Sequence, residues 1–387
     1  MRTMKTTCTR YMFKGKYTDE FSRLSEINYY TEKKPELASF THAVILPARK
    51  SAEHAWGSGG AVTENGQLAD VSRLGNIFGE VYPFDNPNVV LQDETVYYIP
   101  VIPKHWGHFL LDVLCRFWFL LDGNDRGYRI AYCSLDFGEG GLKGNYLEAL
   151  ELLGVPRERL LFITEPTRFA KVLIPENTFG DGGPYCSEYS RIIDYMKTSA
   201  LQAGEKSMPK PEQRIYFTRT QFRRSRYTEV GERRIEELFR QRGFTVLAPE
   251  KLSVREQIFY FNTCREIASL SGTISHNIVF SNPGNRFILL NRCCLPNYAQ
   301  FAVNQLSPAE VTYVDVYAKK TAKKPKYWPV WVEANQNLAA CFEDMGYPGI
   351  QEDTVIRLWW KAENAVQFSY LNTRLKVKNL YYRIRRA

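Results

Sequence analysis

The stretch Arg214-Ile-Tyr-Phe-Thr218 begins an alternation of short apolar segments and longer segments that continues to Leu290. The apolar segments have the length and the aromatic and β-branched residues of buried strands, and the segments between them have the length of helices. We therefore expect strands at 214–218, 244–247, 266–270 and 286–290, and helices at 229–242, 253–264 and 275–282. Strands that alternate with single helices form a parallel sheet, so this half of the chain is predicted to have an α/β fold.

A similar alternation occupies the first half of the chain. We expect strands at 43–47, 88–91, 95–101, 128–133, 160–163 and 171–174, and helices at 105–122, 143–153 and 189–203. The glycine-rich segment 57–60 is interpreted as a break between strands. The polar segment 204–213 contains two prolines, as linkers between domains often do.

The length of 387 residues exceeds what one hydrophobic core usually organises, and 44% hydrophobic residues can fill two cores. We therefore predict a domain at 1–205, a second domain at 206–330, and a helical segment with a basic tail at 331–387. Both domains are expected to be Rossmann-like and to face each other across a cleft, where ligands of such folds bind.

The cysteines and the apolar segments indicate the cellular compartment in which we expect the protein. Eight cysteines are scattered through the chain without a Cys-x-x-Cys pair, which favours a reduced, cytoplasmic protein over a disulfide scaffold. The first 17 residues contain no apolar stretch of secretory length. The longest apolar run, 109–121, is interrupted by Asp112 and Arg116 and is too short to cross a membrane.

The net charge of +9 is concentrated near the C-terminus, where residues 371–387 contain six Lys or Arg and no acid. Apolar residues lie among these cations, as in helices that rest on an anionic membrane surface. Two other interpretations stay open, namely nucleic-acid binding and a solvated terminal helix. A lysine cluster at 319–326 adds a second basic segment. We expect peripheral contact with the inner face of the plasma membrane and no nucleic-acid partner.

The helix expected at 105–122 contains three polar residues, His108, Asp112 and Arg116, within a largely apolar sequence. They are spaced four apart, which places them along one stripe of an α-helix. A buried polar stripe must be satisfied, so the residues form either an internal hydrogen-bonded network or the wall of an active site. A zinc site that includes His105 is disfavoured because no fourth ligand is evident.

Three groups in the second half can bind phosphate or ribose. Arg219 and Arg224 follow the strand at 214–218, and arginines at such strand ends bind phosphates, although an exposed basic loop is the alternative. Glu256 follows Ser253 by three residues, so it either forms a capping box or accepts hydrogen bonds from a ribose.

The third group is the turn after the strand at 266–270. Gly272 and Thr273 precede an expected helix that contains His276 and Asn277. Backbone N–H groups at a helix start stabilise anions, so these residues are candidates for diphosphate binding. Ordinary helix capping is the alternative interpretation.

The order of these motifs resembles glycosyltransferase family 61. The resemblance rests on His-x-x-x-Asp-x-x-x-Arg at 108–116, strand-Thr-Arg at 214–219, Gly243-Phe with the segment 249–257, and Gly-x-x-x-x-Asn-x-x-Phe at 272–280. The pieces Gly59-Gly-Ala-Val-Thr63-x-x-Gly66 and Leu150-x-x-Leu153-Gly154 extend it to about residues 40–290. Where the family often has His-Gly, this chain departs from the pattern with Ser271-Gly272.

The resemblance implies a GT-B fold of two Rossmann-like domains and inverting transfer from a nucleotide sugar without a required metal. By position it assigns His108 and Asp112 to the catalytic helix, Arg219 to the phosphate-facing arginine and Glu256 to a Glu-Gln motif. The chain contains no Asp-x-Asp motif, which fits a metal-independent enzyme.

We therefore expect a cytoplasmic glycosyltransferase that uses a UDP-linked sugar, without a cofactor, to build capsular or other surface polysaccharide on a glycan or lipid-linked acceptor. His105 and Arg116 are assigned to the acceptor side. The expected donor-binding residues are Arg219, Arg224, Glu256, Gly272, Thr273, His276 and Asn277. The alternative is a non-catalytic glycan-binding or assembly module that retains the fold.

Overall fold

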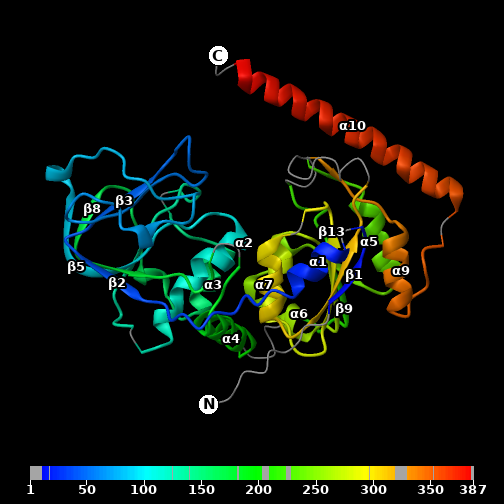
Figure 1. Cartoon of the computed structure of the whole chain (residues 1–387), viewed down its shortest axis with the longest axis horizontal. Coiled ribbons are helices and arrows are strands. Elements are labelled where there is room, and N and C mark those ends of the chain that lie inside the picture. Colours follow the sequence, from blue (N-terminus) through cyan, green and yellow to red (C-terminus); the bar gives the residue numbers. More distant parts are fainter. Residues whose placement is uncertain are drawn as a thin grey trace. The chain divides into compact units, whose positions relative to one another are not determined.

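The computed structural model (Figure 1) describes residues 11–16, 18–123, 125–138, 140–180, 183–202, 209–223, 228–295, 297–318, 329–351 and 353–384. The chain divides into two compact units. Residues 29–207 form one, which we call the upstream unit, and residues 1–28 with 208–387 form the other, the downstream unit. Arg224 and the lysine cluster at 319–326 lie outside the described residues.

The downstream unit is built on a six-stranded sheet, counted over the described residues, in the order β1-β14-β13-β12-β9-β11. Every neighbouring pair in this sheet is parallel. Its strands are β1 (Tyr11–Lys14), β9 (Arg214–Phe217), β11 (Thr245–Leu247), β12 (Glu266–Leu270), β13 (Arg286–Asn291) and β14 (Glu310–Asp315). The mixed α/β fold with a parallel, Rossmann-like sheet that the strand and helix alternation predicts is therefore present here.

The α-helices in the described part of this unit are α1 (Thr18–Ser25), α5 (Glu232–Gln241), α6 (Val254–Thr263), α7 (Tyr298–Leu306), α9 (Gln336–Asp344) and α10 (Thr354–Ile384), with a short 3₁₀ turn at Pro249–Lys251. Four of these helices fall between strands, and the two others, α9 and α10, follow the last strand. The helix expected at 275–282 is instead a 3₁₀ helix at Thr273–Phe280. A small two-stranded sheet pairs β10 (Glu229–Val230) with β15 (Val330–Trp331).

The N-terminal segment belongs to the downstream unit, which differs from the expected domain boundary at 1–205. Strand β1 extends the sheet by parallel pairing with β14. Helix α1 then packs Phe21 edge-on against the rings of Phe301 and Tyr313. Residues 331–387, which we expected to form a separate segment, also belong to this unit.

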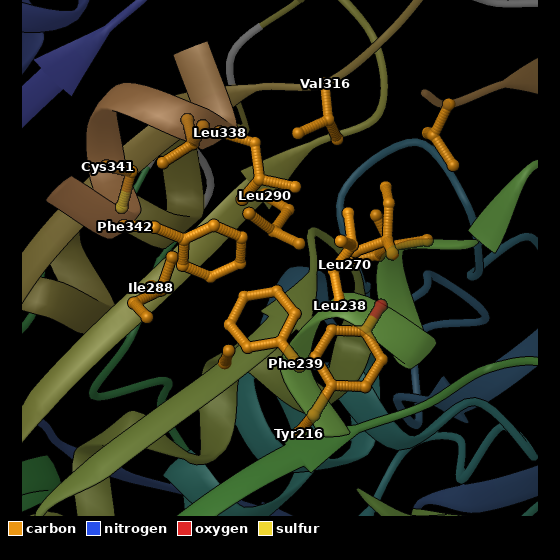
Figure 2. Close-up of a cluster of buried hydrophobic side chains, with 14 of the residues drawn as sticks. Tyr216, Leu238, Phe239, Leu270, Ile288, Leu290, Val316, Leu338, Cys341 and Phe342 are labelled. Atoms are coloured by element: carbon orange, nitrogen blue, oxygen red, sulfur yellow. The ribbon is translucent and has the colours of Figure 1, made fainter. Parts of the chain in front are cut away.

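The core of the downstream unit lies between its sheet and two helices, as Figure 2 shows. Phe239 of α5 stacks on Tyr216 of β9 with ring centroids 4.8 Å apart. The same ring meets Phe342 of α9 edge-on at 5.0 Å. These fully buried aromatic contacts fix the sheet against α5 and α9, and so fix the strand ends where the candidate residues lie.

The upstream unit contains a seven-stranded sheet, again counted over the described residues. The order is β4-β3-β8-β5-β6-β7, and β2 also pairs with β8. Its strands are β2 (Leu37–Thr41), β3 (Val44–Arg49), β4 (Ser58–Val62), β5 (Val90–Ile99), β6 (Ile130–Tyr132), β7 (Leu160–Phe162) and β8 (Thr167–Pro175). Its α-helices are α2 (Trp106–His108), α3 (Asn145–Leu152) and α4 (Ser187–Leu201), and short 3₁₀ turns lie at Asp70–Ser72, Asn86–Asn88 and Arg157–Arg159.

This second sheet is mixed, which corrects the prediction of a wholly parallel Rossmann-like sheet in this half. The strands β8, β5, β6 and β7 are parallel, whereas β2, β3 and β4 pair antiparallel. The two strands expected at 88–91 and 95–101 are one strand, β5, with an irregularity between Gln92 and Thr95.

None of the helices in the described part of the chain is apolar over a length sufficient to cross a bilayer.

Candidate functional site

The histidine-containing helix follows the carboxyl end of β5, a strand inside the parallel part of the upstream sheet. It is not one α-helix, as the spacing had predicted. Helix α2 is continued by a π-helical segment at Phe109–Val113 and then by a 3₁₀ helix at Leu114–Leu120. Such changes of helical pitch alter which residues share a face, and π segments often occur at functional sites.

His108 and Asp112 form a hydrogen-bonded pair on this helix. The distance from His108 Nδ1 to Asp112 Oδ2 is 2.7 Å. Because an ionised carboxylate only accepts hydrogen bonds, it holds the imidazole proton on Nδ1 and leaves Nε2 as the basic nitrogen. The His108 side chain is 42% exposed and that of Asp112 is 17% exposed, so the pair is open to solvent on the histidine side.

Two aromatic rings flank this pair. The Trp56 ring meets the His108 ring edge-on, with centroids 4.4 Å apart. The exposed His105 ring lies 4.7 Å from the His108 ring. Two planar rings, those of Trp56 and His105, therefore lie against the His108 ring.

Arg116 does not belong to this surface, which corrects its assignment to the acceptor side. It is 2% exposed, and its guanidinium donates hydrogen bonds to the carbonyl oxygens of Val71, Arg73 and Pro175. A buried guanidinium needs hydrogen-bond acceptors, and these three backbone carbonyl oxygens supply them on the side of the helix that faces the protein. Arg116 ties the helix to two neighbouring backbone segments.

The downstream sheet has a topological switch point between β9 and β12. Counted along the chain from β9, the strands lie in the order 2-1-3-4-5, which is the flavodoxin-like order. Connections leave the two central strands in opposite directions there, and ligands of such sheets bind outside the carboxyl ends of these strands. Arg219 follows β9 and Gly272 follows β12, so both predicted residues lie at the switch point.

A cluster of one carboxylate and two arginines lies at this edge of the sheet. Arg219 donates through Nε and Nη2 to the two carboxylate oxygens of Glu229, each at 2.8 Å. Arg292, just beyond β13, donates through Nη1 to the same carboxylate at 2.6 Å. A Cβ atom built on Gly272 would lie 3.1 Å from Arg219 Nη1 and 3.9 Å from Arg292 Nη2. We call Arg219, Glu229 and Arg292 the arginine cluster.

The arginine cluster has an excess of positive charge. Burial opposes ionisation of Arg219, but the hydrogen bonds and charge of Glu229 outweigh it and raise the pKa of Arg219. Burial lowers the pKa of Arg292. The neighbouring Glu232 is fully buried, and burial together with the charge of Glu229 raises its pKa to about 8. Near neutral pH, Glu232 is therefore largely protonated, and two guanidinium groups face one carboxylate.

The sequence prediction missed two of these three residues. Glu229 was placed within a helix, but it lies on β10 with its side chain 2% exposed. Arg292 follows a predicted strand by two residues, so the strand-end argument that identified Arg219 also applies to it.

The turn after β12 is only partly available to a ligand. Gly272 and Thr273 are half-buried, but His276 is 6% exposed and Asn277 is fully buried. Asn277 Nδ2 donates to Gln257 Oε1 at 2.9 Å and so joins the 3₁₀ helix to α6. The apolar residues of the 3₁₀ helix are buried with them, which corrects the expectation that His276 and Asn277 face a diphosphate.

Glu256 forms the capping box of α6. Its Oε2 accepts a hydrogen bond from the Ser253 amide at 2.7 Å, and Ser253 Oγ accepts one from the Glu256 amide at 3.1 Å. The capping interpretation of this motif is confirmed.

Two further features lie outside these groups. Glu53, His54 and Glu80 of the upstream unit offer ligand atoms within 4.8 Å of one another and could hold a metal ion. His54 Nδ1 donates to the Asn76 carbonyl oxygen at 3.0 Å, which leaves Nε2 as the potential ligand atom. A cavity of about 330 Å³ lies under the first turns of α10, and none of the predicted site residues that the structure describes lines it.

Comparison with known families gives a match for the middle of the chain. Residues 106–288 match the family model described as Glycosyltransferase 61. The matched range begins at α2, includes both His108 and Asp112, passes through Arg219 and Gly272, and ends within β13. No curated protein is similar enough to count as a match. The part of the chain at 106–288 is thus similar to glycosyltransferase family 61, and this similarity supports a glycosyltransferase activity for the protein.

Proposed function

We propose that the protein is an inverting glycosyltransferase whose general base is His108 and whose reaction needs no metal ion. The observation that carries the proposal is the hydrogen bond from His108 Nδ1 to Asp112 Oδ2, on a histidine that is exposed to solvent. It orients the ring and leaves Nε2 as the nitrogen that accepts a proton.

The reaction has one bond-making and one bond-breaking event at the anomeric carbon. The acceptor hydroxyl gives its proton to His108 Nε2 while its oxygen forms a bond to that carbon from the face opposite the diphosphate. The bond between the carbon and the diphosphate oxygen breaks, and the diphosphate leaves with the electron pair. Asp112 stabilises the imidazolium that results.

The leaving diphosphate gathers negative charge, which an enzyme without a metal must neutralise with its own groups. We assign this task to Arg219 and Arg292, with Gly272 allowing the phosphates to approach both guanidinium groups. Arg224 and Thr273 remain proposed donor contacts. The base would then come from the upstream unit and the diphosphate site from the downstream unit, which is the division found in the GT-B arrangement.

The substrates follow from the family and from the expected role. We propose a UDP-linked sugar as donor and a glycan or lipid-linked glycan of a capsular or other surface polysaccharide as acceptor. His105 and Trp56, whose rings flank the base, are proposed to contact the acceptor.

The test begins with a panel of nucleotide sugars, because a ligand that binds only the folded state raises its melting temperature. With the stabilising donor, we expect His108→Ala to lower transfer by about 10²–10⁴-fold and to leave donor-induced stabilisation unchanged. Unchanged transfer by this variant would overturn the assignment of the base. Donor binding without transfer or slow donor hydrolysis would support the alternative of a non-catalytic glycan-binding module.

The metal requirement is tested separately with a chelator. We expect transfer to persist in EDTA. Loss of transfer that Mn²⁺ or Mg²⁺ restores, and that His54→Ala reproduces, would contradict metal independence and assign a metal to the Glu53, His54 and Glu80 group.

A further inference from the structure

Helix α10 is 31 residues long and packs on the downstream unit through one face only. Leu371 and Asn364 are buried, and Phe368 lies against Trp331 of β15 with ring centroids 5.6 Å apart. Most other described residues of α10 are exposed, and Figure 1 shows it as the long red and orange helix near the C-terminus.

A row of exposed apolar residues runs along this helix. Its members are between 51% and 73% exposed: Val355, Trp359, Val366, Tyr370, Val377 and Tyr381. Their spacing alternates between four and seven residues, so the pattern repeats every 11 residues. Eleven residues make three turns of an α-helix to within about 20°, so the six side chains lie in a band about 80° wide and roughly 40 Å long. We call this row the apolar stripe.

The apolar stripe faces away from the body of the downstream unit. Asn364, which is buried, lies two residues before Val366, a rotation of about 200° on an α-helix. Leu371 lies five residues after Val366, a rotation of about 140°. The face that anchors α10 is therefore opposite the stripe, and the unit's own core does not cover the stripe.

The charges beside the stripe indicate the nature of its partner. Arg374, Lys376 and Lys378 are exposed on the same helix, and residues 371–387 contain no acid. A second copy of the helix in parallel would bring these like charges together. An anionic surface complements these cations.

We propose that α10 lies parallel to an anionic lipid bilayer and inserts the apolar stripe among the headgroups. Trp359, Tyr370 and Tyr381 carry the amphipathic rings that settle at the membrane interface, and the valines between them reach the acyl boundary. The cations near the C-terminal end contact the lipid phosphates. The inference does not depend on the glycosyltransferase reaction, and its test contains no sugar substrate.

The test is cosedimentation of the full-length protein with vesicles. We expect binding to phosphatidylcholine vesicles that contain 30% phosphatidylglycerol, at least about tenfold weaker binding to phosphatidylcholine alone, and loss of binding as salt rises. The variant Trp359→Ser/Tyr370→Ser is expected to lower binding by at least about tenfold. Leu91→Ser is the matched control, because Leu91 is 73% exposed but lies on β5.

A second variant keeps the proposal testable if the stripe variant does not fold. Arg374→Gln/Lys376→Gln/Lys378→Gln is expected to lower binding to the anionic vesicles and to leave binding to phosphatidylcholine unchanged. Equal binding to both vesicles, or binding that survives both substitutions, would overturn the proposal. A dimer that the stripe variant dissociates would assign the stripe to a second copy, and salt-sensitive binding of RNA without vesicle binding would assign the cations to nucleic acid.

Discussion

The histidine pair of the upstream unit and the arginine cluster of the downstream unit differ in how they are built. His108 and Asp112 lie four residues apart on one helix, and the histidine is partly exposed. Arg219, Glu229 and Arg292 come from three separate segments, and the carboxylate at their centre is 2% exposed. The geometry of one helix determines the contact between His108 and Asp112. The order of the strands in the sheet determines which residues meet in the arginine cluster.

This difference matches the chemistry that each group is proposed to perform. A general base must exchange its proton with a substrate, so it needs an exposed nitrogen and one fixed partner. A group that neutralises developing charge must keep its own charge and position, and buried ion pairs hold both. Variants of the two groups should therefore fail in different ways.

After that of His108→Ala, the largest effect is expected from Asp112→Asn. The amide is nearly the same size as the carboxylate, but it carries no charge to stabilise the imidazolium and no longer fixes the proton on Nδ1 of His108. We expect kcat to fall by about 10²–10³-fold, with little change in the KM for the donor. Steady-state kinetics with the donor identified by thermal stabilisation measures both.

The control for this variant is Asp194→Asn. Asp194 is an exposed carboxylate on α4 whose partner, Lys197, is three residues away. It is expected to leave kcat and KM unchanged. If Asp112→Asn also left kcat unchanged but lowered the melting temperature, His108 and Asp112 would form a structural network. The proposed difference in role between this pair and the arginine cluster would then be wrong.

The next largest effect is expected from Glu232→Gln, which should change how the free energy of unfolding depends on pH. The pKa of Glu232 is raised from 4.5 to about 8, so between these values the folded state keeps a proton that the unfolded state releases. The free energy of unfolding is therefore expected to fall as pH rises through this range. Tyr216 Oη and the Arg219 amide both donate to Oε1, an atom that glutamine retains. Glu232→Gln should abolish the slope and stabilise the protein at pH 7 by about 3 kcal/mol.

Urea unfolding at pH 5 and pH 8 checks this expectation, with Glu236→Gln as the control. Burial acts to raise the pKa of Glu236, but hydrogen bonds from Thr218 and Thr220 outweigh it and lower that pKa. The control substitution should therefore destabilise the protein at pH 8. A gain in stability from Glu232→Gln that was equal at both pH values would contradict the raised pKa.

The same contrast explains how much of the fold could be predicted from the sequence. The strands and helices from Arg214 to Leu290 have clear lengths and clear breaks, and the structure confirms them apart from small shifts and one 3₁₀ helix. Strand β4 was missed because its glycines resemble a break. Gly59 has a φ of +140°, and a Cβ there would lie 2.8 Å from the Pro47 carbonyl oxygen, so the close pairing with β3 requires glycine.

The candidate site was predicted where the signal is local. The spacing of His108 and Asp112 predicted their contact, and the strand-end argument placed Arg219 at the switch point. The partners of Arg219 depend on which strands are neighbours, and one sequence does not give that order. The prediction that His276 and Asn277 face a ligand was wrong because both are buried. In one sequence, a polar residue after a turn gives the same pattern whether its side chain is buried in the protein or faces a ligand.

The smallest effect is expected from Arg292→Lys, which tests whether this arginine binds the donor or only balances Glu229. Lysine keeps a positive charge near the carboxylate, but its single ammonium cannot bridge Glu229 and a phosphate as a planar guanidinium can. We expect the KM for the donor to rise by about 10-fold, with kcat nearly unchanged. The control is Arg286→Lys, at the opposite end of the same strand, where the arginine lies 3.7 Å from Glu310. If both variants kept the wild-type KM, Arg292 would belong to the fold alone, and Arg219 would be the arginine of the cluster that binds the diphosphate.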